Sequence, residues 1–156
     1  MATPFEVIYD RFLSNITDYK LARLDDVALE ENLLLWLNQA IGFYPNPRKD
    51  LRDRDMKIKC FNEELNETEI EALAKFMIMS YMNTHLMRED YLSQSLNSKD
   101  YRIYSPANQL KALRELKESI KQEANTLVSR NSYSVESIAE LLRHKGKMHK
   151  GKRYHD

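Results

Sequence analysis

The residues of this chain that could do chemistry are pairs of carboxylates, four histidines and one cysteine. Neighbouring acids of the kind that metal and hydrolase sites use stand at Asp53/Asp55, Glu63-Glu64 and Glu89-Asp90. Charged residues make up 31% of the sequence, so adjacent acids are common in it, and we interpret these pairs as solvated surface. The sequence contains neither of the glycine-rich phosphate-binding motifs nor the His-Glu-x-x-His motif of zinc enzymes.

Histidine and cysteine give no stronger indication of a catalytic site. Three histidines, His144, His149 and His155, lie near the C-terminus, where their spacing could hold a metal weakly but nothing preorganises them. A folded histidine site would depend on His85 alone, which we interpret as an ordinary core or surface residue. We interpret Cys60 as a small buried hydrophobic residue, with a reactive thiol as the alternative. The Glu-x-x-His pairs of helical di-metal proteins are absent, so the sequence predicts no enzyme, no cofactor and no metal site.

Length and composition favour one helical domain. A chain of 156 residues with 42% hydrophobic residues can bury a single modest core. Three glycines and four prolines are few for a loop-rich or all-β protein. A lone cysteine cannot form an internal disulfide, and no long apolar run or secretory leader is present. We expect a soluble, intracellular protein that does not enter a membrane.

The formal net charge of zero conceals two regions of opposite charge. Residues Arg143–Asp156 carry six Lys or Arg and one Asp, a charge of about +5. The other 142 residues have 18 basic and 23 acidic side chains, a charge of about −5. We therefore divide the chain into a helical domain, residues 1–142, and a basic C-terminal tail, residues 143–156, which we expect to be flexible.

The basic tail is the candidate site for binding a partner. Its side chains suited to this are Arg143, Lys145, Lys147, Lys150, Lys152, Arg153 and Tyr154. The cations could contact phosphates of a nucleic acid while the tyrosine stacks on a base. The same tail could instead dock on an acidic protein and fold as it binds, or serve only as a solubilising end.

The first two predicted helices are marked by their ends. The pattern Thr3-Pro4-Phe5-Glu6 is typical of a capping box and predicts a first helix of about three turns. A second helix should begin near Asp25-Asp26 and end at Gly42, ahead of Pro45. The run Leu33-Leu34-Leu35 broadens the apolar face of this helix, which predicts burial on more than one side.

The third and fourth helices are the longest. The third has Asn66 as its N-cap with Glu69 three residues on, and should end at about residue 88 or 91. The fourth opens at Ser105-Pro106 and continues to about Arg130. Its apolar residues recur every three or four positions, at Leu110, Leu113, Leu116, Ile120, Ala124, Leu127 and Val128. A short fifth helix is predicted from Ser134.

The segment Arg48–Asn62 shows no helical period. Within it Met56, Ile58 and Cys60 alternate with charged residues, which is typical of a short strand. Because the chain offers no second convincing strand, we expect an extended connection rather than a sheet. The sequence thus predicts an all-α fold: a small bundle of four to five helices with one long central helix, within Ser98–Ser134, and an extended basic C-terminal tail.

Several short motifs occur in an order that resembles a known group of proteins. They are Ile16-Thr17-Asp18-Tyr19; Asp50-Leu51-x-Asp53-Arg54-Asp55; Phe61-Asn62-x-x-Leu65-Asn66-x-x-Glu69-Ile70; Leu96-x-x-Lys99-Asp100-Tyr101-x-x-Tyr104-Ser105-x-Ala107-Asn108-x-Leu110-Lys111; and Tyr133-Ser134. Together they resemble the small helical head–tail connector, or adaptor, proteins in the neck of tailed bacteriophages. The resemblance spans roughly residues 15–135, and the tail Arg143–Asp156 has no counterpart in it.

The resemblance implies a structural virion protein. Connectors of this kind are α-helical and assemble as a ring, typically a dodecamer, beneath the portal of the DNA-filled head. They extend the channel through which DNA leaves and give the tail its docking surface. The implied partners are further copies of this chain, the portal protein, a tail or second neck protein, and DNA that passes without sequence-specific contact, with no membrane.

The resemblance also places the tail and the protein itself. The fifth helix and tail, Ser134–Asp156, would reach the portal, so that Arg143 and the other tail residues named above would contact the portal or DNA. The implied location is the neck of the virion, and the host cytoplasm during assembly. The alternative is a small helical nucleic-acid-binding or regulatory protein that uses the basic tail.

Overall fold

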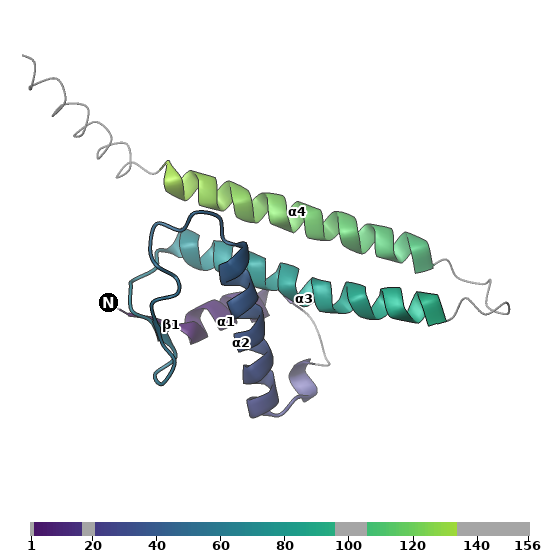
Figure 1. Ribbon diagram of the computed structural model, residues 1–156, viewed down its shortest axis with the longest axis horizontal. Coiled ribbons are helices and arrows are strands. Elements are labelled where there is room, and N and C mark those ends of the chain that lie inside the picture. The colour runs from purple at the N-terminus through teal and green to yellow at the C-terminus, as the bar shows by residue number, and fades with distance from the viewer. Residues whose placement is uncertain (1, 17–20, 96–105, 134–156) are drawn as a thin grey trace, which may run out of the picture.

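The computed structural model describes residues 2–16, 21–95 and 106–133 (Figure 1). Their elements are β1 (Thr3–Pro4), α1 (Phe5–Ser14), the 3-10 turn η1 (Leu21–Arg23), α2 (Asp26–Phe43), β2 (Arg54–Asp55), β3 (Cys60–Phe61), α3 (Glu67–Ser95) and α4 (Pro106–Ser132). The described part of the chain is therefore mostly helical, as predicted. The predicted fifth helix from Ser134 and the basic tail Arg143–Asp156 lie outside the described residues.

The central helix is α3. It packs against α1, α2 and α4, with α4 along one side of it and α1 and α2 on the other (Figure 1). Three successive residues, Ala72, Leu73 and Ala74, have no exposed surface. Successive helical residues point about 100° apart, so burial of three in a row requires neighbours around much of the helix. The prediction of one long central helix within Ser98–Ser134 is therefore wrong in its position, because α4, the described helix of that segment, buries one stripe only.

That stripe runs along α4, which lies antiparallel to α3. Leu110, Ala124 and Val128 are buried, Ile120 and Leu127 are partly buried against the core, and most other residues of α4 are exposed. The spacing agrees with the predicted apolar face except at Leu116, which was predicted to lie on it and is 52% exposed. Figure 1 shows α3 and α4 continuing side by side beyond the part of the molecule that contains α1 and α2.

The core between α1, α2 and α3 is rich in aromatic rings. The ring centroid of Trp36 lies 5.6 Å from that of Phe12 and 5.3 Å from that of Tyr81. Phe5 packs edge-on against Phe61 at 5.0 Å, which joins the start of α1 to β3. Large rigid rings of this kind bury much apolar surface at low entropic cost, and they fix how the three helices cross.

The segment between α2 and α3 contains a small sheet, so the prediction of a purely helical fold is wrong here. Three two-residue strands pair antiparallel in the order β1-β3-β2. The paired residues are Thr3 with Phe61, Pro4 with Cys60, Arg54 with Phe61, and Asp55 with Cys60. The extended segment was predicted, but its partner β1 is only two residues long and directly precedes a helix, so no alternation in the sequence marks it.

Thr3 does not cap α1, which corrects the predicted capping box. The helix begins at Phe5, and its N-cap residue, Pro4, makes no side-chain cap bond. The Thr3 hydroxyl oxygen instead accepts a hydrogen bond from the backbone N–H of Leu65 at 2.8 Å. This bond and the strand pairing tie the N-terminal residues to the segment that leads into α3.

The other helix ends agree more closely with the sequence. Asp25 is the N-cap of α2, where its side chain accepts a hydrogen bond from the N–H of Ala28 at 3.1 Å. This helix ends at Phe43, one residue beyond the predicted glycine. α4 begins at Pro106 as predicted, whereas α3 continues to Ser95, past its predicted end.

Replacing Leu73 by alanine should destabilise the protein by about 2–5 kcal/mol, because the lost side chain leaves a cavity at the centre of the bundle. The matched control is Leu116→Ala, which deletes the same atoms from a side chain on α4 that is 52% exposed. We expect this control to cost less than about 1 kcal/mol. Urea unfolding followed by circular dichroism measures both, and equal losses would contradict a core centred on α3.

Candidate functional site

The carboxylates Asp53 and Asp55 serve to fold the segment between α2 and α3. The Asp53 carboxylate accepts a hydrogen bond from the side-chain amide of Asn62 at 2.5 Å. The Asp55 carboxylate accepts one from the backbone N–H of Lys57 at 2.8 Å. Within residues 2–16, 21–95 and 106–133, no group of three or more His, Cys, Asp or Glu side chains is placed to hold a metal ion. Asp53 therefore binds a side chain, and Asp55 a backbone N–H, of the segment to which both belong.

The other two residues considered for chemistry are packing residues. His85 lies edge-on to the ring of Tyr81, with centroids 4.5 Å apart. Cys60 is buried in β3, as predicted for a small hydrophobic residue. The candidate partner-binding residues of the tail, Arg143 to Tyr154, lie outside the described residues.

The most connected polar site in the described chain surrounds Glu69, which is only 4% exposed. Its Oε2 accepts hydrogen bonds from the Lys49 ammonium at 2.6 Å and from the backbone N–H of Asn66 at 2.8 Å. The Asn66 side chain in turn accepts a bond from the Glu69 N–H at 2.9 Å. This reciprocal pair is the capping box predicted for the start of α3.

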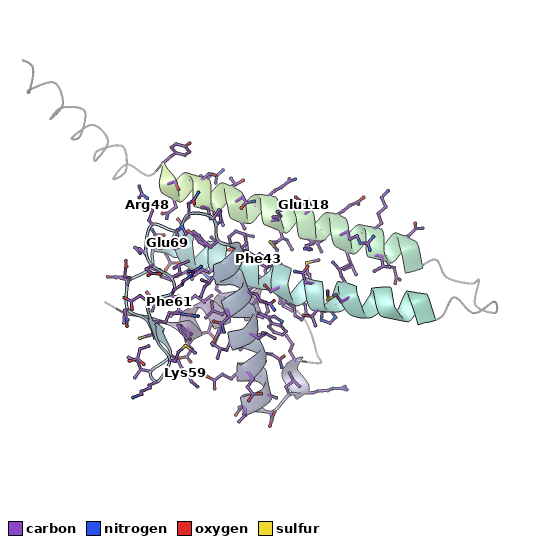
Figure 2. The ribbon with its side chains drawn as sticks, in the orientation of Figure 1. Phe43, Arg48, Lys59, Phe61, Glu69 and Glu118 are labelled. Carbon is purple, nitrogen blue, oxygen red and sulfur yellow. The ribbon has the colours of Figure 1, made fainter. Side chains whose placement is uncertain are left out.

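The end of α4 also reaches this site. Asn131 donates to Glu69 Oε1 at 3.4 Å, and it accepts a hydrogen bond from the Asn66 side chain at 2.9 Å. The Lys49 ammonium also donates to the backbone carbonyl of Glu64 at 2.6 Å. We call Lys49, Asn66, Glu69 and Asn131 the Glu69 cluster, and Figure 2 shows Glu69 where α3 begins, near the end of α4. Sequence reasoning missed Lys49 and Asn131, since no local spacing relates them to Glu69.

Two tyrosines have perturbed acidity. Burial, followed by the charge of Glu69, raises the pKa of Tyr44 to about 12, although a hydrogen bond with Asn131 opposes the shift. Burial, followed by the charge of Glu30, raises the pKa of Tyr9 to about 12. Both phenols are thus held neutral by surroundings that disfavour a second negative charge.

Ion pairs join α1 to α3 and α3 to α4. Arg11 of α1 contacts Glu67 at 2.9 Å and Glu71 at 3.0 Å, and Lys75 contacts Glu123 of α4 at 2.8 Å. The groove between α3 and α4 has a volume of about 560 Å³ and is lined by Glu71, Lys75 and residues of α4 between Ser119 and Arg130. Because its charges are paired within the chain and partly exposed, they orient helices and contribute little stability.

Besides Val7, Leu24 and Tyr133, large apolar side chains of the described residues are exposed at three places. Val27, Leu35 and Phe43 lie on α2, Met56 and Ile58 lie between β2 and β3, and Met87 and Leu116 lie on α3 and α4. The run Leu33-Leu34-Leu35 illustrates this, because Leu33 is buried whereas Leu35 is 51% exposed. The predicted second apolar side of α2 exists, but no described element covers it. Grouped apolar residues on a surface indicate protein contacts.

Comparison with protein-family models, with curated proteins and with solved structures finds no match to this chain. Among the helices of the described residues, none is long and apolar enough to cross a membrane. Any inference about function therefore depends on the Glu69 cluster and on the exposed apolar residues of α2, of the turn between β2 and β3, and of the α3–α4 pair.

Replacing Glu69 by alanine should destabilise the fold by about 3–5 kcal/mol, because the change removes a helix cap and leaves the Lys49 ammonium without its carboxylate. Glu69→Gln retains an acceptor for the cap and should cost less. The matched control is Glu67→Ala, since Glu67 is 80% exposed and should contribute less than about 1 kcal/mol. Chemical unfolding separates the three variants, and a Glu69→Ala loss as small as the control would contradict this role.

Stability should fall as the pH rises from 10 to 12. An unfolded tyrosine loses its proton near its ordinary pKa of 10.0, whereas Tyr9 and Tyr44 keep theirs to about 12, so unfolding releases protons in this interval. The change in absorbance at the tyrosinate wavelength should show two of the nine tyrosines titrating late. Tyr9→Phe and Tyr44→Phe should each remove one late step. Titration of all tyrosines near pH 10 in the folded protein would contradict the assignment.

Proposed function

We propose that this chain is a structural virion protein of the phage neck, which forms a ring between portal and tail and has no catalytic role. The ring would extend the DNA channel and support the joining of head and tail. Its partners would be further copies of itself in a dodecameric ring, the portal protein, and a tail or second neck protein. The support combines the motif resemblance with the way in which the fold distributes its buried and exposed surface.

The motif residues between Asp50 and Ile70 contribute to one structural unit, which supports the resemblance. Asp50 accepts a hydrogen bond from the N–H of Arg52 at 2.9 Å, and Asp53 holds Asn62. Phe61 is buried against Phe5, and the pair Asn66 and Glu69 caps α3. This part of the likeness to connectors therefore rests on residues that shape the segment between α2 and α3 and the start of α3, and not on composition.

The observation that carries the proposal is the α3–α4 hairpin. α4 has 27 residues, a length of about 40 Å, yet it is held by one narrow apolar stripe. The hairpin projects beyond α1 and α2, and the large apolar residues Met87 and Leu116 on it are 65% and 52% exposed (Figure 1). A small domain gains nothing in its own core from such a projection, so we assign it to contacts with other molecules.

Charge gives further support. The chain outside the tail is acidic overall, and Asp25 and Asp26 stand at the start of α2. Acidic walls repel the phosphate backbone, which suits a channel that DNA must leave without sticking. The basic tail Arg143–Asp156 would then contact the portal, outside the path of the DNA.

The test is assembly on the portal ring of the phage that encodes this chain. We expect electron microscopy of the mixture to show a second ring on the same axis, with a mass that corresponds to a dodecamer of this chain. A variant that ends at residue 142 should lose most of its affinity for the portal and keep its helical circular dichroism. The full chain without the portal serves as the control.

Two results would contradict the proposal. The first is a stable monomer that does not bind portal rings at any accessible concentration. The second is DNA binding that weakens steeply with salt and disappears in the variant ending at residue 142, with no ring formed. That second result would favour the alternative, a small helical nucleic-acid-binding or regulatory protein that uses its basic tail.

A further inference from the structure

The outward face of α2 carries a charge between two large apolar residues. Val27, Glu31 and Leu35 are spaced four residues apart, so they share one face of the helix and span about 12 Å. All three are exposed, Val27 at 67% and Leu35 at 51%, while Leu33 and Trp36 of the same helix are buried. Glu31 makes no ion pair with any residue in the described part of the chain. We call these three residues the α2 stripe.

The turn between β2 and β3 carries the same pattern with the opposite charge. Met56 and Ile58 are 49% and 69% exposed, and the exposed Lys57 lies between them. No described residue forms an ion pair with Lys57. We call Met56, Lys57 and Ile58 the loop tip. Its three residues form a tight turn, so their side chains occupy a small area of the surface.

The loop tip is held in one conformation before anything binds it. The Asp55 carboxylate accepts hydrogen bonds from the N–H groups of Lys57 at 2.8 Å and Ile58 at 3.4 Å. Lys59 adopts a left-handed backbone conformation with φ of 52°, and its carbonyl accepts a bond from the N–H of Phe5 at 2.9 Å. Its ammonium pairs with Glu30. A surface fixed in this way loses little conformational freedom when it binds.

We propose that the loop tip of one copy of this chain packs on the α2 stripe of the next copy, with Lys57 beside Glu31. Each surface offers two apolar side chains and one unpaired charge, and the charges are opposite in sign. Burying the apolar residues removes them from water, and the ion pair fixes the register. Because the two surfaces differ, the contact can repeat head to tail from copy to copy, and such a repeat closes a ring when the rotation permits. This inference rests on the proposed function, for which it names the subunit boundary.

The same features disfavour a nucleic acid as the partner of the loop tip. Met56 and Ile58 are large apolar side chains, whereas contacts to a phosphate backbone are made by cationic or hydrogen-bonding groups. The Lys59 ammonium is already paired with Glu30, and the Asp55 carboxylate lies beside Lys57, so the turn offers little free positive charge to phosphates. A second copy satisfies the apolar and the charged residues together.

Charge reversal on full-length protein tests the contact. Glu31→Lys and Lys57→Glu should each weaken self-association by about tenfold or more in sedimentation velocity, because each places like charges face to face. The double variant should recover most of the association. An equal mixture of the two single variants should recover it too, since unlike copies can alternate. The matched controls Asp10→Lys and Arg52→Glu, at exposed positions outside both surfaces, should change it little.

Disulfide trapping supplies an independent measurement. A Val27→Cys chain mixed with an Ile58→Cys chain should form a cross-linked pair under mild oxidation, since each carries only one accessible thiol. Cys60 is buried and should stay reduced. Val7→Cys, at an exposed position on α1, mixed with the same Ile58→Cys chain should cross-link far less.

The results separate this inference from the proposed function. Cross-linking and charge recovery without binding to the portal would sustain the subunit boundary and contradict the phage neck. A portal-bound ring that tolerates both charge reversals and gives no Val27–Ile58 cross-link would overturn the boundary and leave the neck proposal standing. Equal loss of association in the two controls would also overturn it.

Discussion

The burial of the Glu69 carboxylate is the constraint on which the rest of the structure depends. A charge that is 4% exposed must be met by partners, because leaving it unpaired away from water costs several kcal/mol. Lys49, the N–H of Asn66 and the amide of Asn131 meet it from three different segments. The carboxylate therefore fixes where the connecting segment, the start of α3 and the end of α4 lie relative to one another.

This arrangement explains why the two ends of the α3–α4 hairpin differ. Near Glu69 the hairpin is held by charged and polar contacts as well as by Ala124 and Val128 of the apolar stripe. Farther along, beyond the layer of Trp36 and Tyr81, only α3 and α4 remain in contact with each other (Figure 1). The α3–α4 pair therefore has one end that is fixed to the rest of the chain and one end that projects from it. The two ends expose different surfaces.

The sequence predicts the features that depend on neighbouring residues. The cap formed by Asn66 and Glu69, the N-cap Asp25 and the start of α4 at Pro106 all follow from local spacing. The partners of Glu69 and the pairing of Thr3 with Phe61 join residues far apart in the chain, and no periodicity reports them. The position of α3 at the centre is of the same kind. In α2, the leucine run indicates two apolar sides, but only the fold shows which of them the chain itself covers.

Three aspartates explain how the long connection between α2 and α3 is held in one conformation. A segment without helices is ordinarily mobile, and ordering it on binding would cost about 1–2 kcal/mol per residue. Asp50, Asp53 and Asp55 each bond to groups within the segment, and β3 pairs with strands on both sides. The segment is therefore already ordered in the folded chain, so a contact made at Met56 and Ile58 would not carry that loss. The hydrogen bonds of these carboxylates fix the conformation of the segment, and so they fix which side chains the turn between β2 and β3 exposes.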